Sequence, residues 1–276
     1  PLSKSVSNRA LIINALTVNA APVAPLADCG DTIAMRRALA SADEKIDIGD
    51  AGTAMRFLTA FYATREGRTT LLDGSERMRH RPIAPLVDAL RQCGADIKYA
   101  GEEGFPPLRI TGRQLTGGDM SIDASISSQF ISALLMIAPL MTDGLRLHLD
   151  GDPASLPYID LTVDMMRRAG AEAERYNDLL TVGHGSYDPA ATLPAEGDWS
   201  AASYWYEIEA ITGGFLTLKG LDASSRQPDR RAIDLFGALG AVTQPGEESA
   251  DDLDLTGSPD VAPRLNADLS ATPDLT

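Results

Sequence analysis

The chain has 276 residues, 44% of them hydrophobic, which is enough for a substantial core and suggests about two domains. Its 24 Lys and Arg residues against 39 Asp and Glu give a formal net charge of -15, which argues against a general nucleic-acid binder or a polybasic membrane binder. The longest apolar run, Phe130 to Met141, is far shorter than the ~20 residues that span a bilayer, and the Cys and His residues lack metal-ligand spacing, so we expect a soluble, cytoplasmic protein without a structural metal.

One kind of predicted helix is apolar on nearly all sides. These helices begin on residue types that cap free backbone N–H groups, at Ser5, Gly52, Ser127 and Asp198. From Gly52 onward the starts recur about every 75 residues, which indicates an internal repeat. The same interval places a fifth start at Asp274.

A second kind of predicted helix is amphipathic and follows each of the last three apolar ones. These helices begin near Arg81, Pro157 and Pro228, and each ends at a glycine suited to a left-handed C-terminal position, namely Gly94, Gly170 or Gly240. Short strands follow, the second of each pair beginning at Pro107, Leu179 and Leu253. The repeating unit is therefore predicted to be strand, buried helix, strand, amphipathic helix and two strands.

The repeat also predicts the domain organisation. Residues 1-195 are expected to form an N-terminal domain of three such units, the first incomplete at its start, and residues 196-276 to form part of a second domain. The helix-poor stretch from Tyr187 to Gly197 is the candidate linker. Both ends of the chain interrupt a unit, so we expect a fragment or a chain described only in part.

Polar residues gather at the predicted starts of the buried helices. A helix N-terminus carries unpaired N–H groups and a partial positive charge, so it receives phosphate or carboxylate readily. Any single Ser or Gly at such a place is better explained as an ordinary cap. Repetition at several starts, with Lys4 and Arg9 about one helical turn apart, favours an anion site.

The densest basic cluster is formed by Arg77, Arg79 and Arg81. Three arginines near a helix start are usually solvated, and they lie at the wrong helix end for the dipole. Their guanidinium groups nevertheless suit carboxylate and phosphate oxygens. The aromatic cluster Trp199, Tyr204, Trp205 and Tyr206 is interpreted as core.

Six segments resemble one family. In chain order they are S-K-S-V-S-N-R-A-L-I, D-A-G-T-A-M-R, E-R-M-R-H-R-P-I, G-F-P-P-L-R-I-T-G, S-I-S-S-Q-F-I-S-A-L-L-M-I-A-P-L and P-Y-I-D. Together they resemble the EPSP synthase family, the 3-phosphoshikimate 1-carboxyvinyltransferases of the shikimate pathway of aromatic amino-acid biosynthesis. The related UDP-N-acetylglucosamine carboxyvinyltransferases are an alternative, but the S-S-Q and G-T-A-M-R motifs fit them poorly.

The resemblance implies an α+β protein of two domains, an inside-out α/β barrel built from repeated βαβαββ units with buried parallel helices. It implies transfer of the enolpyruvyl group of phosphoenolpyruvate to the 5-hydroxyl of shikimate 3-phosphate, through a tetrahedral intermediate that releases phosphate. No cofactor is expected, because the chemistry is proton transfer and charge stabilisation in a closed site. The expected partners are these two small molecules, without nucleic acid or membrane, and a monomer is expected.

Motif matching assigns two overlapping sets of site residues. Those implied for shikimate 3-phosphate are Lys4, Ser5, Arg9, Ser127, Ser128, Gln129, Ser155, Tyr158 and Asp274. Those implied for phosphoenolpyruvate, or for the inhibitor glyphosate, are Lys4, Gly52, Arg81 and Gln129. Lys4 would also donate a proton, and Asp274 would act as general base at the attacking hydroxyl. Asp260 is the competing candidate for the base, although it falls outside the repeat interval.

The sequence also departs from the family pattern. Asp50 stands where Asn is usual, Leu156 where a basic residue is common, and Pro228 where glycine is common. The later motifs K-E-T-D-R and N-D-H-R, which complete the phosphoenolpyruvate site, do not occur in the chain. We therefore expect no turnover from this chain alone, and a non-catalytic fragment that binds shikimate 3-phosphate is the alternative function.

Overall fold

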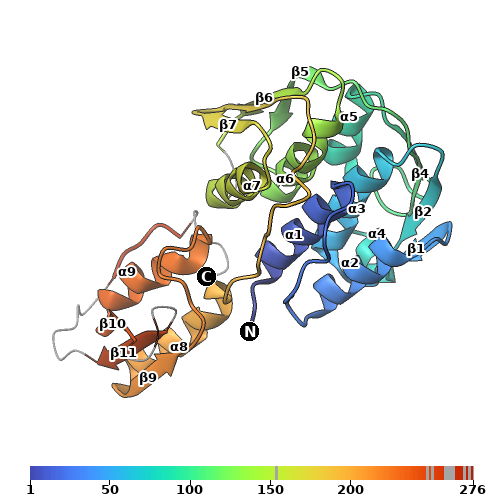
Figure 1. Cartoon of the computed structure of the whole chain (residues 1–276). Helices are drawn as coiled ribbons and strands as arrows, with labels where there is room; N and C mark the ends of the chain where they lie inside the picture. Colours follow the sequence, from blue (N-terminus) through green and yellow to red (C-terminus); the bar gives the residue numbers. More distant parts are fainter. Residues whose placement is uncertain are drawn as a thin grey trace.

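The computed structural model describes residues 1–152, 155–246, 249, 252–257, 265–269, 272 and 275. Its buried apolar side chains form two clusters, one drawn from Val6 to Leu193 and the other from Trp199 to Leu255. Figure 1 shows the corresponding blue-to-yellow and orange-to-red parts of the chain as separate bodies. Asp260 and Asp274, the two candidates for the general base, lie outside the described residues.

The first complete unit is built around a four-stranded sheet. In chain order it comprises β1 (Lys45–Asp47), α3 (Gly52–Ala63), β2 (Thr69–Asp73), α4 (Glu76–Arg79), α5 (Ala84–Gln92), β3 (Asp96–Tyr99) and β4 (Leu108–Thr111). The strand order is β1-β2-β4-β3, with β1 parallel to β2 and the other two pairs antiparallel. The single-turn helix α4 is an addition that the sequence pattern did not predict.

The second complete unit repeats this arrangement. It comprises β5 (Gly118–Asp123), α6 (Ser128–Ile137), η1 (Ala138–Leu140), β6 (Leu145–Asp150), α7 (Leu156–Arg168), β7 (Ala173–Tyr176) and β8 (Leu179–Val182). The strand order is β5-β6-β8-β7, again with the first pair parallel and the others antiparallel. Two sheets of identical topology establish the predicted βαβαββ repeat.

Incomplete units stand at both ends of the described chain. The first contributes α1 (Lys4–Leu16) and α2 (Gly30–Ala40), which precede β1. The last contributes α8 (Trp199–Thr212), β9 (Phe215–Leu218), η2 (Pro228–Arg231), α9 (Ala232–Gly237), β10 (Ala241–Pro245) and β11 (Leu253–Gly257). Its sheet order, β10-β11-β9, matches the last three strands of a complete unit. The strand expected before α8 is reduced to one antiparallel bridge, between Leu2 and Gly197.

Helices α1, α3 and α6 lie inside the first body, with the two complete sheets on its outside (Figure 1). All residues of α3 are buried, as its composition requires, because a helix that is apolar all round must be covered on every side. Its Thr59 hydroxyl donates to the Met55 carbonyl at 2.7 Å, which removes the cost of burying an unpaired polar group. The predicted starts of the four buried helices all agree with the structure to within one residue.

The amphipathic helices and their glycines also follow the sequence prediction. Helices α5 and α7 and the pair η2 and α9 occupy the three predicted places. Gly94, Gly170 and Gly240 have φ angles of 96°, 87° and 102°, in the left-handed region where a side chain is disfavoured. These glycines therefore let the chain turn from each helix into the following strand.

The candidate linker is docked against the first body rather than free. Tyr187 is buried, and its hydroxyl donates to the Met136 carbonyl at 2.7 Å.

The aromatic cluster after the linker is only partly core. Trp199 and Tyr206 are buried, whereas Tyr204 and Trp205 on α8 are 65% and 47% exposed. No helix among the described residues is long and apolar enough to cross a bilayer.

Candidate anion-binding site

A cavity of about 260 Å³ opens where the N-terminal ends of four helices meet. Its lining comes from the starts of α1, α3, α6 and α7, and consists of Lys4, Ser5, Arg9, Thr53, Ile126, Ser127, Ser128, Gln129, Ser155 and Tyr158. No Asp or Glu is among these lining residues. The cavity is thus a positively charged site in a chain whose net charge is -15.

The first turn of α1 places a cation at this cavity. Ser3 caps the helix, because its hydroxyl accepts a hydrogen bond from the Val6 N–H at 3.4 Å. Lys4 is exposed at the first helical position, and within the described part of the chain it forms no ion pair of 4.0 Å or less. A free ammonium group beside unpaired N–H groups favours a negatively charged ligand.

Hydroxyl groups line the cavity at the starts of α6 and α7. Ser127 caps α6 by accepting a hydrogen bond from the Gln129 N–H at 3.2 Å, and Ser128 is the first helical residue. Ser155, the residue before α7, has φ 58° and ψ 50° and makes no capping bond with its side chain. A left-handed conformation is uncommon for serine, and such outliers cluster at ligand sites. Its hydroxyl remains available to a ligand.

Arg9 brings a second positive charge, which is buried. Its guanidinium donates to the Thr162 hydroxyl at 2.7 Å, the Ser5 carbonyl at 3.0 Å, and both the Ser132 hydroxyl and Tyr158 carbonyl at 3.2 Å. Burial lowers its pKa to about 10, opposed by nearby Tyr158, so the group is charged at neutral pH. Within the described chain no carboxylate pairs with it. Because a buried charge without a counterion is costly, an anion in the cavity would stabilise this arrangement.

Gly52 and Arg81 form a second pair beside the cavity. A methyl group on Gly52 would lie 3.0 Å from Cζ and 3.1 Å from Nη2 of Arg81, so the guanidinium packs directly on the first residue of α3. Neither residue lines the cavity itself, but Thr53, which follows Gly52, does. The structure therefore joins Gly52 to Arg81 and places Lys4 and Gln129 in the adjoining cavity.

Two charged residues near this pair were not assigned from the sequence. Arg56, one turn into α3, is buried and donates to the Gly52 carbonyl at 3.2 Å. Its pKa is lowered to about 10, chiefly by burial and then by the like charge of Arg81, while Asp31 opposes the shift. Asp31 accepts a hydrogen bond from the Thr53 N–H at 3.3 Å. In the sequence, Arg56 stands four residues, about one helical turn, after Gly52, and this spacing was the signal that could have placed Arg56 near Gly52.

The described part of the chain offers no obvious metal centre, since it contains no group of three or more His, Cys, Asp or Glu side chains placed to hold an ion. Of the nine residues predicted for shikimate 3-phosphate, eight line the cavity, and the ninth, Asp274, is not described. These side chains can bind a small polyanion through hydroxyls, helix N-termini and two cations.

The topology and cavity together define a class: an α+β protein of βαβαββ repeats that gathers the N-termini of its helices around one cavity. Comparison with known proteins agrees. The domain model for EPSP synthase (3-phosphoshikimate 1-carboxyvinyltransferase) matches residues 36–263. The chain belongs to the EPSP synthase family.

Individual relatives show how far the similarity extends. The 3-phosphoshikimate 1-carboxyvinyltransferase of Bacteroides fragilis is 45% identical over 276 residues, covering 100% of this chain and 66% of the relative. That of Methanospirillum hungatei is 37% identical over 303 residues, covering 100% and 69%. The solved EPSP synthase of Acinetobacter baumannii shares the fold with a TM-score of 0.78 at 21% identity, covering 94% of this chain and 63% of that one. The chain thus spans about two thirds of the length of these relatives.

Proposed function

We propose that the chain carries the shikimate 3-phosphate-binding half of a 3-phosphoshikimate 1-carboxyvinyltransferase of the shikimate pathway. The observation that carries this proposal is the cavity, which collects eight residues of the family's motifs from three separate segments of the chain. Family members with this name support the substrate assignment. The reaction is addition of the substrate 5-hydroxyl to C2 of phosphoenolpyruvate, followed by loss of phosphate from the tetrahedral intermediate.

Each group around the cavity has a role in this proposal. The hydroxyls of Ser127, Ser128 and Ser155 and the N-termini of α6 and α7 receive the phosphate of shikimate 3-phosphate. Ser5, Gln129 and Tyr158 contact the ring, and Arg9 supplies a fixed positive charge whose guanidinium has one further N–H to donate. Arg9 is already held by its four hydrogen bonds, so it needs little reorganisation when the ligand binds.

The second substrate is assigned to the adjoining pair. Phosphoenolpyruvate carries a phosphate and a carboxylate, and Arg81, Lys4 and Gln129 can donate to both, with Gly52 allowing close approach of the backbone. Lys4, which is assigned to both substrates, is also the proposed proton donor. Asp274 is proposed as the general base, with Asp260 as the competing candidate.

The wider organisation belongs to the same proposal. We assign a first domain to residues 1-195 and a partial second one to 196-276, supported by the two separate hydrophobic clusters. The complete enzyme would be an inside-out α/β barrel of such units, cytoplasmic and monomeric, requiring no cofactor. Because the K-E-T-D-R and N-D-H-R motifs do not occur in this sequence, we propose that the 276-residue chain binds shikimate 3-phosphate without turnover.

Isothermal titration calorimetry with shikimate 3-phosphate tests the binding proposal, with unphosphorylated shikimate as the matched ligand. We expect shikimate 3-phosphate to bind at least tenfold more tightly, because charge-assisted hydrogen bonds contribute about 1.5–3 kcal/mol. Equal affinities would refute the assignment of the cavity to a phosphate. Phosphate release from both substrates together, measured on the same sample, would contradict the expectation of no turnover.

A further inference from the structure

Arg81 depends on its surroundings for its position. Arg81 is exposed, and it follows a short segment in which the one helix, α4, has only four residues. A helix of one turn is unstable by itself, because nucleation fixes several dihedral angles for one hydrogen bond. Contacts from elsewhere must therefore hold residues 74–82, here called the Arg81 turn, against the start of α3.

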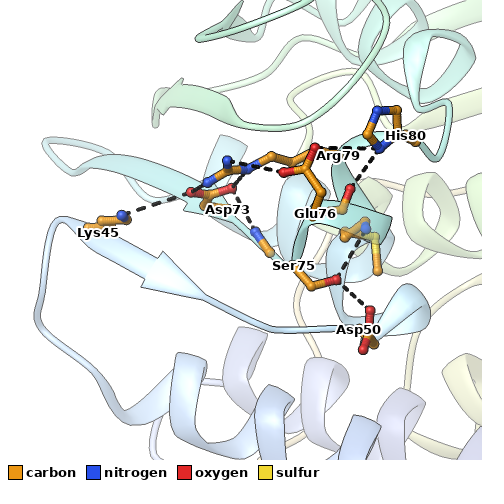
Figure 2. Close-up of polar contacts among 9 residues, drawn as sticks. Lys45, Asp50, Asp73, Ser75, Glu76, Arg79 and His80 are labelled. Atoms are coloured by element: carbon orange, nitrogen blue, oxygen red, sulfur yellow. Dashed lines mark hydrogen bonds and ion pairs between the residues drawn. The ribbon is translucent and has the colours of Figure 1, made fainter.

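The first such contact is an ion pair at the end of β2. Arg79 donates from Nε and Nη2 to the two carboxylate oxygens of Asp73, at 2.9 and 2.8 Å (Figure 2). The Asp73 side chain is 4% exposed, and Lys45 Nζ lies 3.9 Å from the same carboxylate. The bonds from Arg79 lower the pKa of Asp73, assisted by the Gly74 N–H and opposed by burial. A bidentate pair of this kind fixes orientation as well as distance.

The second contact ties the Arg81 turn to the loop before α3. The Ser75 hydroxyl accepts from the Met78 N–H at 3.2 Å, which caps α4, and donates to Asp50 Oδ1 (Figure 2). The Ser75 N–H donates to the Gly49 carbonyl at 3.0 Å. At Gly74 a methyl group would lie 2.7 Å from that carbonyl oxygen, so only glycine permits this close approach.

A third contact comes from inside the core. The buried Arg56 donates to the Pro82 carbonyl at 3.3 Å and to the Gly52 carbonyl at 3.2 Å. Arg56 therefore links Pro82, the residue after Arg81, to Gly52, the residue on which the Arg81 guanidinium packs. The Arg81 N–H in turn donates to the Met78 carbonyl at 3.0 Å. The turn is held at both ends and in the middle.

We propose that the Asp73–Arg79 ion pair and the Ser75–Asp50 hydrogen bond are positioning contacts that hold Arg81 at the start of α3 and so set the affinity for phosphoenolpyruvate. This inference rests on the proposed function, which assigns that ligand to Arg81. Neither Arg79 nor Ser75 touches the ligand in this scheme. Each acts by sparing Arg81 the conformational entropy that it would otherwise lose on binding.

The test compares Arg79→Ala, Arg79→Lys and Ser75→Ala with the unaltered chain. Arg113→Ala is the matched control, because Arg113 makes a 2.8 Å ion pair with Asp96 outside the proposed site. Phosphoenolpyruvate binding is followed by phosphorus NMR at saturating shikimate 3-phosphate, and shikimate 3-phosphate binding by calorimetry. Amide hydrogen exchange of residues 76–81 reports directly on the turn.

We expect Arg79→Ala to weaken phosphoenolpyruvate binding about three- to tenfold, the range for ordering one long side chain, and to speed exchange at residues 76–81. Shikimate 3-phosphate affinity should be unchanged, Arg79→Lys should recover part of the loss, and Arg113→Ala should have no effect. Ser75→Ala should reproduce the loss with the ion pair intact.

Unchanged phosphoenolpyruvate affinity in both Arg79→Ala and Ser75→Ala would overturn the inference. Equal weakening of both ligands would also overturn it, since that result indicates general destabilisation. Arg81→Ala separates this failure from failure of the proposed function. If Arg81→Ala leaves phosphoenolpyruvate binding unaltered, the assignment of the ligand to Arg81 is wrong; if it weakens binding while the other variants do not, only the positioning role is wrong.

Discussion

Replacing Gly52 with alanine adds one methyl group at the point where Arg81 meets α3. The new Cβ would lie 3.0 Å from Cζ of Arg81, closer than the 3.5–4.0 Å at which carbon atoms pack favourably. It would also overlap Nη1 of the same side chain, its nearest neighbour, so the guanidinium must move by roughly 1 Å or more. Because it is the far end of a flexible side chain, this displacement costs the fold little.

Binding should suffer more than stability. The displaced guanidinium loses the alignment of a charge-assisted hydrogen bond worth about 1.5–3 kcal/mol. A loss at the lower limit weakens phosphoenolpyruvate or glyphosate binding roughly tenfold. Alanine also has a higher helix propensity than glycine by up to about 1 kcal/mol, so the free energy of unfolding should not fall.

Phosphorus NMR titration of phosphoenolpyruvate at saturating shikimate 3-phosphate measures this effect, with urea unfolding as the stability assay. Gly30→Ala is a matched control, because Gly30 also begins a helix and a methyl group there would meet nothing within 4 Å. We expect Gly30→Ala to bind normally. Unchanged phosphoenolpyruvate affinity in Gly52→Ala would refute the claim that contact between Gly52 and Arg81 shapes the binding site.

Three further results are expected. Arg9→Met should abolish tight binding of shikimate 3-phosphate in calorimetry, because it removes the buried cation of the cavity, and it should lower the free energy of unfolding by about 1–3 kcal/mol, because buried acceptors lose their donor; shikimate 3-phosphate affinity equal to that of the unaltered chain would contradict this. Asp73→Asn should reduce the loss of stability that urea unfolding measures as the pH falls below about 4. The Asp73 carboxyl has a folded pKa below its usual 3.8, so it stabilises the fold above that pH, and this contribution is lost as the pH falls through the folded pKa. An unchanged dependence of the free energy of unfolding on pH in this range would argue against the prediction. Asp274→Ala, in a form of the protein that turns over, should eliminate phosphate release while shikimate 3-phosphate binding stays within about tenfold, and a normal rate would exclude Asp274 as the base.

Much of the fold was predictable because it repeats. The helices that begin at Gly52 and Ser128 are both apolar on nearly all sides, and each complete unit folds into a sheet of the same order. The cavity residues were predictable from motif resemblance, and their shared position at helix N-termini supplied a physical reason. Both inferences depend on local sequence, which backbone hydrogen bonding and capping translate directly into structure.

Other features required contacts between distant segments. Tyr204 and Trp205 belong to an aromatic cluster, yet both are exposed because α8 turns only one stripe toward its small sheet. The sequence suggested a solvated Arg79, whereas the fold brings it onto the buried Asp73. Asp50 differs from the usual family residue, and its hydrogen bond with Ser75 was not predictable because it joins two loops that are distant in the sequence.

The sequence alone determined that this is an acidic α+β chain of βαβαββ repeats, in which polar groups begin each buried helix. Composition and periodicity are local properties, so they set the kind of element and its interval along the chain. Only the tertiary structure decided that a chain with a net charge of -15 has a cavity that Lys4 and Arg9 line and no carboxylate lines. The reason is that electrostatic potential depends on which charges lie within a few ångströms of one another, and that distance is set by the packing of segments far apart in sequence.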